Sequence, residues 1–266
     1  PLALGQFVLG AALAIWATDK LLSGLVGIAR FLPVSVFAAG AVLSGLEAEN
    51  IAVGVAAGAG DAAEIALGTV FGGATFLVCV ALGLGGVIAP LELRLPRSFL
   101  FPIAATPVVA GIGVLGDHQS RLAGAALLVL FAAAMTFVVL RSRAEGFGLD
   151  EEIEEAIEAP ASAPRAAVAT ILGLAGLSAG GMLVAAGASG LIVSLGLLPL
   201  LVGMVVTPAA IELEEIVRQA VPARRGRPDV SAANFVGTLL YFLLFNLGLI
   251  ALLTPVAVDP RIRSLD

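Results

Sequence analysis

Two groups of carboxylate side chains lie inside apolar stretches of this sequence. The two groups, with the amide that belongs to the first, are Glu47, Glu49 and Asn50, then Glu212, Glu214 and Glu215. Between Arg30 and Asp61 the first two acids are the only charged residues. An acid near the middle of a bilayer costs several kcal/mol unless it is paired, protonated or bound to an ion. Ca²⁺ prefers oxygen ligands of this kind, so these six side chains are candidate ligands of a cation.

Spacing along a helix decides which of the candidates share a face. Residues three apart lie on one face, whereas residues two apart point about 200° away from each other. We therefore expect Glu47 and Asn50 to line one site together, and Glu212 and Glu215 to do the same. The second acid of each group would point elsewhere on a regular helix.

Helix breaks and counter-charges bear on the same two groups. Gly45 and Pro208, which precede them, predict locally broken helices that expose carbonyl groups as further ligands. We expect no intramembrane arginine or lysine beside the acids in sequence, with Lys20 as the one candidate. A bound divalent cation or protons would then relieve the repulsion among the acids. The alternative is that the acids only cap helices or form hydrogen bonds within a broken helix.

The composition indicates the class of protein that must position these side chains. Of 266 residues, 59% are hydrophobic and 13% are charged, and the mean hydropathy is +1.07. Soluble domains carry about 25% charged residues, and apolar runs of roughly 20 residues, enough to cross a bilayer, recur along this chain. We predict an all-α polytopic membrane protein. The single Cys79 and the single His118 exclude an internal disulfide and a Cys- or His-rich metal centre.

Apolar runs between charged or Pro/Gly-rich breaks predict eight transmembrane helices. They cover residues 3–28, 33–57, 64–88, 99–115, 121–140, 166–192, 197–219 and 231–253. We interpret residues 1–140 as a first inverted repeat with helices one to five, residues 141–165 as a cytoplasmic loop, and residues 166–266 as a second inverted repeat with helices six to eight. The acidic segment 150–158 is expected to be a solvated linker; regulatory calcium binding is the alternative.

The distribution of basic residues predicts the orientation. The loops after helices one, three, five and seven are assigned Arg30, Arg94, Arg97, Arg141, Arg143, Arg165, Arg218, Arg224, Arg225 and Arg227. The opposite loops and the C-terminal end hold Arg121, Arg261 and Arg263. By the positive-inside rule the first set is cytoplasmic. We therefore expect a multi-pass protein of the cell membrane with its N-terminus outside.

The chain repeats itself at an offset of 165 positions. At this offset Glu47 meets Glu212, and Gly72 meets Gly237. Each matched helix is separated from its copy by five spans, so the copies must run in opposite directions through the membrane. Inverted repeats with ion sites at their interface are typical of secondary transporters.

These residues resemble the cation/calcium exchanger superfamily, the sodium/calcium and calcium/proton antiporters. Each of the family's two α-repeats carries a motif like G-T-S-L-P-E, followed by a helix with G-N-x-x-G-S-N. Residues 45–50 and 210–215 are similar to the first motif, and residues 68–74 and 233–239 to the second. The family's ligand positions fall here on Glu47 and Glu212 (serine), Glu49 and Glu214 (proline), Asn50 and Glu215 (glutamate), Gly73 and Thr238 (serine), and Leu77 and Phe242 (asparagine or aspartate). The resemblance implies that the site architecture is kept, with Thr238 as a further ligand, while the acids have moved onto the second and seventh helices.

The most specific hypothesis is an alternating-access antiporter that exchanges Ca²⁺, or another divalent cation, for Na⁺ or H⁺. A cation channel and an intramembrane metal-dependent enzyme are the alternatives, although no nucleophile–base constellation supports an enzyme. We expect no cofactor, and as partners the transported cations and the lipid bilayer, with no nucleic acid and a monomeric state. Loss of neutral oxygen ligands at Gly73, Leu77 and Phe242 removes places for several Na⁺ ions, which favours proton coupling.

The repeat also predicts the length of the complete protein. Residues 258–263 resemble residues 93–98, which lead into the fourth helix. We therefore expect counterparts of the fourth and fifth helices beyond Asp266, for a total of ten helices. The fourth and fifth helices of the first repeat should then pack on one side of the repeat interface.

Overall fold

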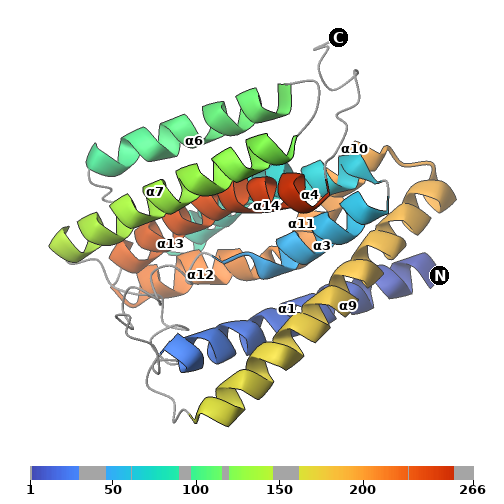
Figure 1. Cartoon of the computed structure of the whole chain (residues 1–266), viewed down its shortest axis with the longest axis horizontal. Coiled ribbons are helices and arrows are strands. Elements are labelled where there is room, and N and C mark those ends of the chain that lie inside the picture. Colours follow the sequence, from blue (N-terminus) through green and yellow to red (C-terminus); the bar gives the residue numbers. More distant parts are fainter. Residues whose placement is uncertain are drawn as a thin grey trace.

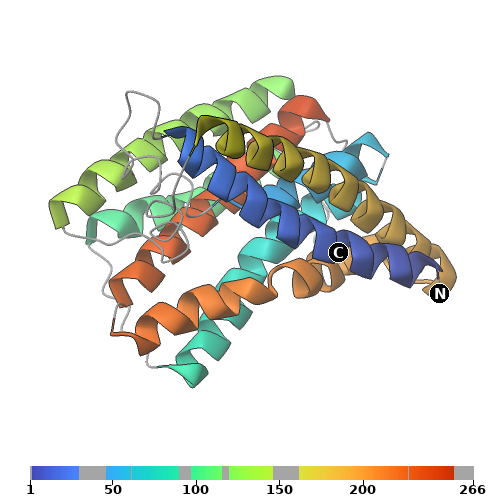
Figure 2. The same ribbon diagram turned by 90° about the horizontal axis from the view of Figure 1, so that it is seen from below.

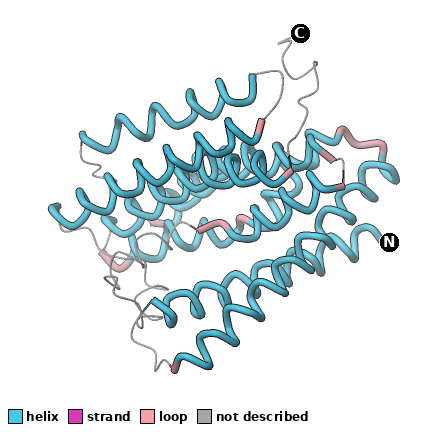
Figure 3. Tube along the Cα trace, viewed as in Figure 1, coloured by secondary structure: helices cyan, strands magenta, loops and turns pink. Residues whose placement is uncertain are grey.

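The computed structural model describes residues 2–29, 46–60, 62–89, 97–115, 120–145, 162–226 and 228–254. Within these residues every regular element is a helix (Figures 1 and 3), which confirms the all-α prediction. The elements are α1 (Leu2–Ala29), α3 (Ala48–Ala59), α4 (Ala63–Phe76), η1 (Leu77–Ala81), α5 (Leu82–Ile88), α6 (Arg97–Leu115), α7 (Arg121–Glu145), α9 (Ala163–Leu195), α10 (Pro199–Leu201), η2 (Val202–Val206), α11 (Thr207–Ile211), α12 (Leu213–Arg224), α13 (Pro228–Leu240), η3 (Tyr241–Asn246) and α14 (Leu247–Leu253).

The helices follow the predicted apolar runs, with two differences at the polar segment 141–165. Helix α7 continues to Glu145, and α9 begins already at Ala163, so both ends of the predicted loop are helical. Ser162 in an extended conformation followed by a proline in the first turn fits a helix start before the apolar run. The acidic segment 150–158 and the first part of the predicted helix 33–57 lie outside the described residues.

Among the residues that the structure describes, five helices are long and apolar enough to cross a membrane. These helices are Leu2–Ile28, Ala63–Ile88, Arg121–Arg141, Ala163–Leu195 and Val230–Leu253. Large apolar side chains such as Val87, Phe101 and Leu122 are exposed, whereas several glutamate, asparagine and threonine side chains are fully buried. This arrangement, apolar outside and polar inside, is that of a multi-pass membrane protein. The total of eight spans stays a prediction.

The helix bounds follow the offset of 165 residues that the sequence shows. Adding 165 to 48 and 59, the bounds of α3, gives 213 and 224, the bounds of α12. Adding 165 to 63 and 88, the ends of the continuous helix α4–η1–α5, gives 228 and 253, the ends of α13–η3–α14. Both continuous helices contain a π-helical segment, and these two segments end 165 residues apart, at 81 and 246. Equivalent stretches of the chain therefore build equivalent elements.

Helices α1 and α9, which are also equivalent at this offset, pack side by side along most of their length (Figures 1 and 2). A Cβ added at Gly10 would lie 2.6 Å from the backbone nitrogen of Val184, and one at Gly24 would lie 2.5 Å from that of Thr170. As the residue number increases along α1, the number of the residue contacted in α9 decreases, so the two helices are antiparallel. Small residues permit this close approach, and the opposite directions are those expected of inverted repeats.

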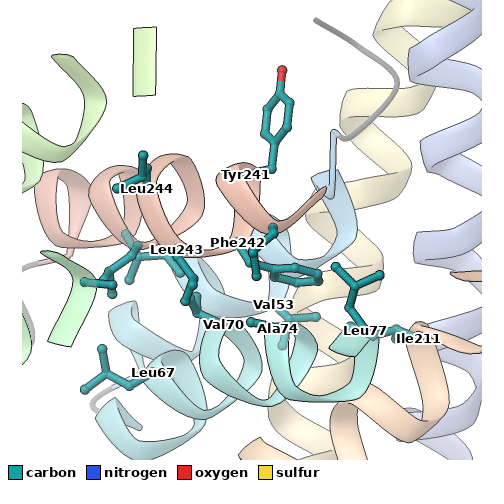
Figure 4. Close-up of a cluster of buried hydrophobic side chains, with 14 of the residues drawn as sticks. Val53, Leu67, Val70, Ala74, Leu77, Ile211, Tyr241, Phe242, Leu243 and Leu244 are labelled. Atoms are coloured by element: carbon teal, nitrogen blue, oxygen red, sulfur yellow. The ribbon is translucent and has the colours of Figure 1, made fainter. Parts of the chain in front are cut away.

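The two continuous helices form the centre of the molecule. Phe242 of η3 is fully buried, and Figure 4 shows its ring beside Val53, Ala74 and Leu77, whereas Tyr241 points the other way. Helices α6 and α7 pack against α13, η3 and α14 on the side away from α1 and α9 (Figure 1). The polar side chains described next lie where α3, α4, α12 and α13 meet.

Candidate functional site

Both acidic groups begin at the start of a helix. Glu47 directly precedes α3 with φ −95° and ψ 66°, and Glu212 lies between α11 and α12 with φ −97° and ψ 8°. The predicted break near Pro208 is therefore confirmed, and it falls four residues after the proline, at Glu212. Gly45 lies outside the described residues. Each break places an acid at a helix N-terminus, where the backbone dipoles favour negative charge.

Three carboxylates from the two repeats converge. Glu47, Glu49 and Glu212 each offer one carboxylate oxygen, and these oxygens all lie within 4.8 Å of one another. The three side chains are at most 1% exposed. Hard cations such as Ca²⁺ bind carboxylate oxygens gathered in this way. Acids so close together in a buried site need a bound cation, protons or a fixed positive charge to offset their repulsion.

Glu49 is in this cluster, and so the expectation that it points elsewhere is wrong. That expectation applied helical spacing to Glu47 and Glu49. Because Glu47 precedes the first residue of α3 and has a non-helical conformation, the 200° separation does not relate the two side chains. Thr18 of α1 lies against Glu49, with its hydroxyl 2.6 Å from Glu49 Oε2.

Asn50 connects the two repeats. Its side-chain amide donates a hydrogen bond to Oε1 of Glu212, and its carbonyl oxygen accepts one of 2.8 Å from the Thr69 hydroxyl. Asn50 is fully buried. Glu47 and Asn50 thus both lie beside Glu212, and that they line one ion site together stays a prediction.

Glu215 has a different set of neighbours from the three clustered acids. Its Oε2 accepts hydrogen bonds from Asn234 Nδ2 at 3.2 Å and from Gln219 Nε2 at 3.5 Å. Its Oε1 lies 3.1 Å from Nη1 of Arg218. At the 165-residue offset, the contact between Asn234 and Glu215 is equivalent to that between Thr69 and Asn50. The two repeats thus form a hydrogen bond between equivalent positions. The accepting residue is an amide, Asn50, in the first repeat and an acid, Glu215, in the second.

Arg218 corrects two expectations. We assigned it to a loop and expected no intramembrane base beside the acids except Lys20. Instead the Arg218 side chain is 9% exposed and its Nη1 lies 3.7 Å from Glu47 Oε1 as well as 3.1 Å from Glu215, whereas Lys20 is exposed on α1. Residue 218 falls inside the predicted helix 197–219, and α12 places its side chain in the site, one turn after Glu215.

Other polar atoms at the meeting point of these helices are buried and have no hydrogen-bond partner among the described residues. They are Oε1 of Glu49, Oγ1 of Thr207 and Thr238, Oδ1 of Asn234 and Asn246, and Oε1 of Gln219. Thr238, the ligand that the resemblance implies, is among them. The side chain of Glu214 lies outside the described part of the chain. Buried oxygen atoms without partners are costly in a protein interior, and a cation or ordered water would satisfy them.

The sequence did not lead us to five of the site's polar residues. These are Thr18, Thr69, Arg218, Gln219 and Asn234. A signal was available for two of them, because Thr69 and Asn234 are polar residues matched at the 165-residue offset within apolar helices. For Thr18, only the packing of α1 against the repeat interface places it near Glu49.

The contact between Thr18 and Glu49 gives a first prediction. Valine has the shape of threonine without the hydroxyl. Thr18→Val therefore removes the contact with Glu49 and the hydroxyl's 3.1 Å contact with Ala14 O in its own helix. A hydrogen bond to a charged group contributes about 1.5–3 kcal/mol; we expect part of it, about fivefold in affinity, to be lost from cation binding. Binding of radioactive Ca²⁺ to the purified protein measures this.

Thr136→Val is the matched control, because the Thr136 hydroxyl donates only to Ala132 O within α7 and is exposed. Equal Ca²⁺ affinities for Thr18→Val and the control would show that the hydroxyl has no part in holding Glu49.

Comparison with known proteins identifies the family. The sequence matches the family described as "Sodium/calcium exchanger protein" over residues 2–140 and 165–266. These segments include both helix breaks and every carboxylate of the cluster. The chain belongs to the sodium/calcium exchanger protein family.

Individual proteins agree with this membership. The exchanger is 25% identical to the inner membrane protein YrbG of Escherichia coli (strain K12), over 100% of this chain and 84% of that protein. It is 26% identical to the putative antiporter CaxA of Alkalimonas amylolytica, over 98% of this chain and 84% of that protein.

Solved structures show the same fold at lower identity. The H⁺/Ca²⁺ exchanger CAX matches with a TM-score of 0.71 at 19% identity, over 97% of this chain and 71% of that one. The sodium-calcium exchanger NCX_Mj, in a crystal soaked without Na⁺ and Ca²⁺, matches with a TM-score of 0.57 at 23% identity, over 99% and 86%. These likenesses confirm the predicted all-α fold. Membership of the sodium/calcium exchanger protein family confirms the predicted class, a cation antiporter, and this is a family of transporters rather than enzymes.

Proposed function

We propose that Glu47, Glu49 and Glu212 bind the transported divalent cation at the interface of the two repeats. The observation that carries this proposal is the convergence of their oxygens within 4.8 Å in a buried position. Both repeats contribute carboxylates, so a movement of one repeat against the other changes the distances within the site. Asn50 is a neutral partner, because its amide already donates to Glu212 while its carbonyl oxygen faces Thr69.

Further oxygen ligands come from the helices that follow. Ca²⁺ takes six to eight oxygens, more than three carboxylates supply if each binds through a single oxygen. Thr238 and Asn246 have buried oxygens without partners among the described residues, and Asn246 Nδ2 lies 3.5 Å from the carbonyl oxygen of Glu47. We assign these side chains to the wider ligand set. Glu214 and Glu215 complete the acidic group of the second repeat.

The non-helical residues Glu47, directly before α3, and Glu212, between α11 and α12, fit an alternating-access mechanism. In secondary transporters, broken helices at the repeat interface hold the ion while one part of the protein rocks against the other. Here α1 and α9 form one closely packed pair, and a Cβ added at Gly181 of α9 would lie 2.5 Å from backbone atoms of Ala52 in α3. Movement of this pair is therefore transmitted directly to the helix that carries Glu49 and Asn50.

We propose proton rather than sodium coupling. Phe242 and Leu77 are fully buried and apolar, and the ring of Phe242 occupies the space beside Gly73. At positions 73, 77 and 242 the interface therefore offers no side-chain oxygen to additional Na⁺ ions. The carboxylates of the cluster can instead accept protons when the divalent cation leaves.

Uptake of radioactive Ca²⁺ into liposomes tests the coupling. Vesicles that contain the purified exchanger receive either an imposed pH gradient or an imposed Na⁺ gradient at constant pH. We expect the pH gradient to drive uptake at least about tenfold faster than the Na⁺ gradient. Uptake that follows Na⁺ and ignores pH would reverse the assignment of the counter-ion. Ca²⁺ uptake that runs down the Ca²⁺ concentration gradient and needs neither imposed gradient would favour a channel.

For topology and assembly, we propose a monomer in the cell membrane with the N-terminus outside. Removing Arg218 from the cytoplasmic count leaves nine basic residues against three, which supports the same orientation under the positive-inside rule. Protease protection of tags at the two ends of the chain, in right-side-out and inside-out vesicles, tests the orientation.

A further inference from the structure

The guanidinium of Arg218 joins an acid from each repeat. Nη1 lies 3.1 Å from Oε1 of Glu215, on the same helix, and 3.7 Å from Oε1 of Glu47, at the start of α3. All three side chains are at most 9% exposed. Arg218 is therefore part of the same buried polar group as the proposed cation site.

Arginine differs from every other group in this site because its charge is permanent. A guanidinium keeps its proton at all accessible pH values, whereas a buried lysine readily loses one. A buried arginine without acidic neighbours is strongly unfavourable, and here Glu215 and Glu47 supply them. The site thus holds one fixed positive charge whether or not a transported ion is bound.

Comparison of the repeats shows what this charge balances. At the 165-residue offset, Glu215 is equivalent to Asn50, and Arg218 is equivalent to Val53. Both pairs are three residues apart on equivalent helices, α3 and α12. The first repeat has two neutral residues where the second has an acid and a base. The additional acid and the additional base cancel, so both pairs carry no net charge.

We propose that Arg218 is a resident cation that neutralises Glu215 and leaves Glu47, Glu49 and Glu212 to the transported ion. This inference rests on the proposed function of those three acids. Because its charge does not leave the site, Arg218 replaces one positive charge that would otherwise enter and leave with each transport cycle. It lowers the affinity for Ca²⁺ by direct repulsion and lowers the number of coupling ions exchanged for one Ca²⁺.

The decisive variant is Arg218→Gln. Removal of a positive charge next to a divalent cation in a buried site should tighten Ca²⁺ binding by at least about tenfold. The Hill coefficient with which the coupling ion displaces Ca²⁺ should rise by about one, because Glu215 then needs an exchangeable charge. Binding of radioactive Ca²⁺ to the purified protein, with increasing H⁺ or Na⁺, measures both. Unchanged or weaker Ca²⁺ binding in Arg218→Gln would overturn the inference.

Two controls separate charge from structure. Arg218→Lys keeps a positive charge while its ammonium group stays protonated beside Glu215 and Glu47. Under acidic conditions its Ca²⁺ affinity should therefore stay closer to that of the original protein than the affinity of Arg218→Gln does. Arg224→Gln removes the same charge from an exposed position two turns later on α12, and should leave Ca²⁺ binding unchanged. If Arg224→Gln and Arg218→Gln tighten Ca²⁺ binding equally, the cause is the general surface charge and not the position of Arg218.

A double variant keeps the inference testable if Arg218→Gln does not fold. Glu215→Gln alone leaves the guanidinium without its main acid and should weaken Ca²⁺ binding by about tenfold or more. Adding Arg218→Gln to it makes the pair neutral, as Asn50 and Val53 are, and should recover most of that loss. If Glu215 contributed only as a direct ligand, the second substitution would recover nothing.

The same measurements distinguish this inference from the proposed function. Loss of Ca²⁺ binding in Glu212→Gln supports the three-carboxylate site independently of Arg218. If Glu212→Gln loses binding and Arg218→Gln does not tighten it, the site stands and the resident-cation role fails. If Glu212→Gln binds Ca²⁺ normally, the proposed site itself is wrong.

Discussion

We expect Glu212→Gln to abolish Ca²⁺ exchange, with uptake reduced by more than about 100-fold. Glu212 is at most 1% exposed and lies in the cluster with Glu47 and Glu49. A direct contact between a carboxylate and a divalent cation in a buried site exceeds the roughly 2.8 kcal/mol that corresponds to 100-fold in affinity. Glutamine keeps a carbonyl oxygen that accepts the hydrogen bond from Asn50, so the fold should be retained.

The loss should appear in Ca²⁺ flux and not in the yield or thermal stability of the purified protein. Glu64→Gln is the matched control, since this carboxylate lies in the first turn of α4, is only partly buried and is outside the three-acid cluster. Near-normal flux in a protein that carries both Glu47→Gln and Glu212→Gln would exclude these acids as ligands of the transported ion.

Gly72→Leu prevents correct folding. A Cβ at Gly72 would lie 2.5 Å from the carbonyl oxygen of Met204 and 2.6 Å from its Cα. These are backbone atoms of η2, so no side-chain rotation relieves the contact, and α4 must separate from η2. Overpacking a core already costs about 1–3 kcal/mol, and we expect more than about 3 kcal/mol here. Yield of monodisperse protein and the midpoint of thermal unfolding in detergent measure this loss.

Gly83→Leu is the control for this substitution. Gly83 lies on the same continuous helix as Gly72, is exposed, and an added Cβ there would meet no atom within 4 Å. Leucine at this lipid-facing position should be tolerated with near-normal yield. If both variants fold equally well, the close approach of α4 and η2 does not constrain residue 72.

Much of the fold can be predicted from the sequence because the bilayer restricts which backbone structures can form. In lipid, backbone groups must be satisfied within each segment, so long apolar runs form helices whatever packs against them. The sequence repeat is equally informative, because the offset that aligns Glu47 with Glu212 also aligns the ends of α3 with those of α12. Local propensity and the repeat sufficed for these elements.

Which residues form the site could not be predicted from their spacing along the sequence. Glu49 lies with Glu47 because the helix begins between them, and a change of one or two residues in a helix start redirects a side chain by more than 100°. Sequence patterns locate helix ends less accurately than that. Side-chain direction at a helix break is therefore decided by the tertiary structure.

The sequence by itself determined the all-α membrane fold, the repeat, and a concentration of carboxylates inside apolar segments. Only the tertiary structure decided which groups balance those charges. Arg218 is charged, follows an apolar run and reads as a loop residue, and Thr18 is one polar residue of a long helix. Contacts between residues 47 and 218, or 18 and 49, arise from the packing of helices distant along the chain. Electrostatic compensation in a buried site depends on those distances and on the local dielectric constant.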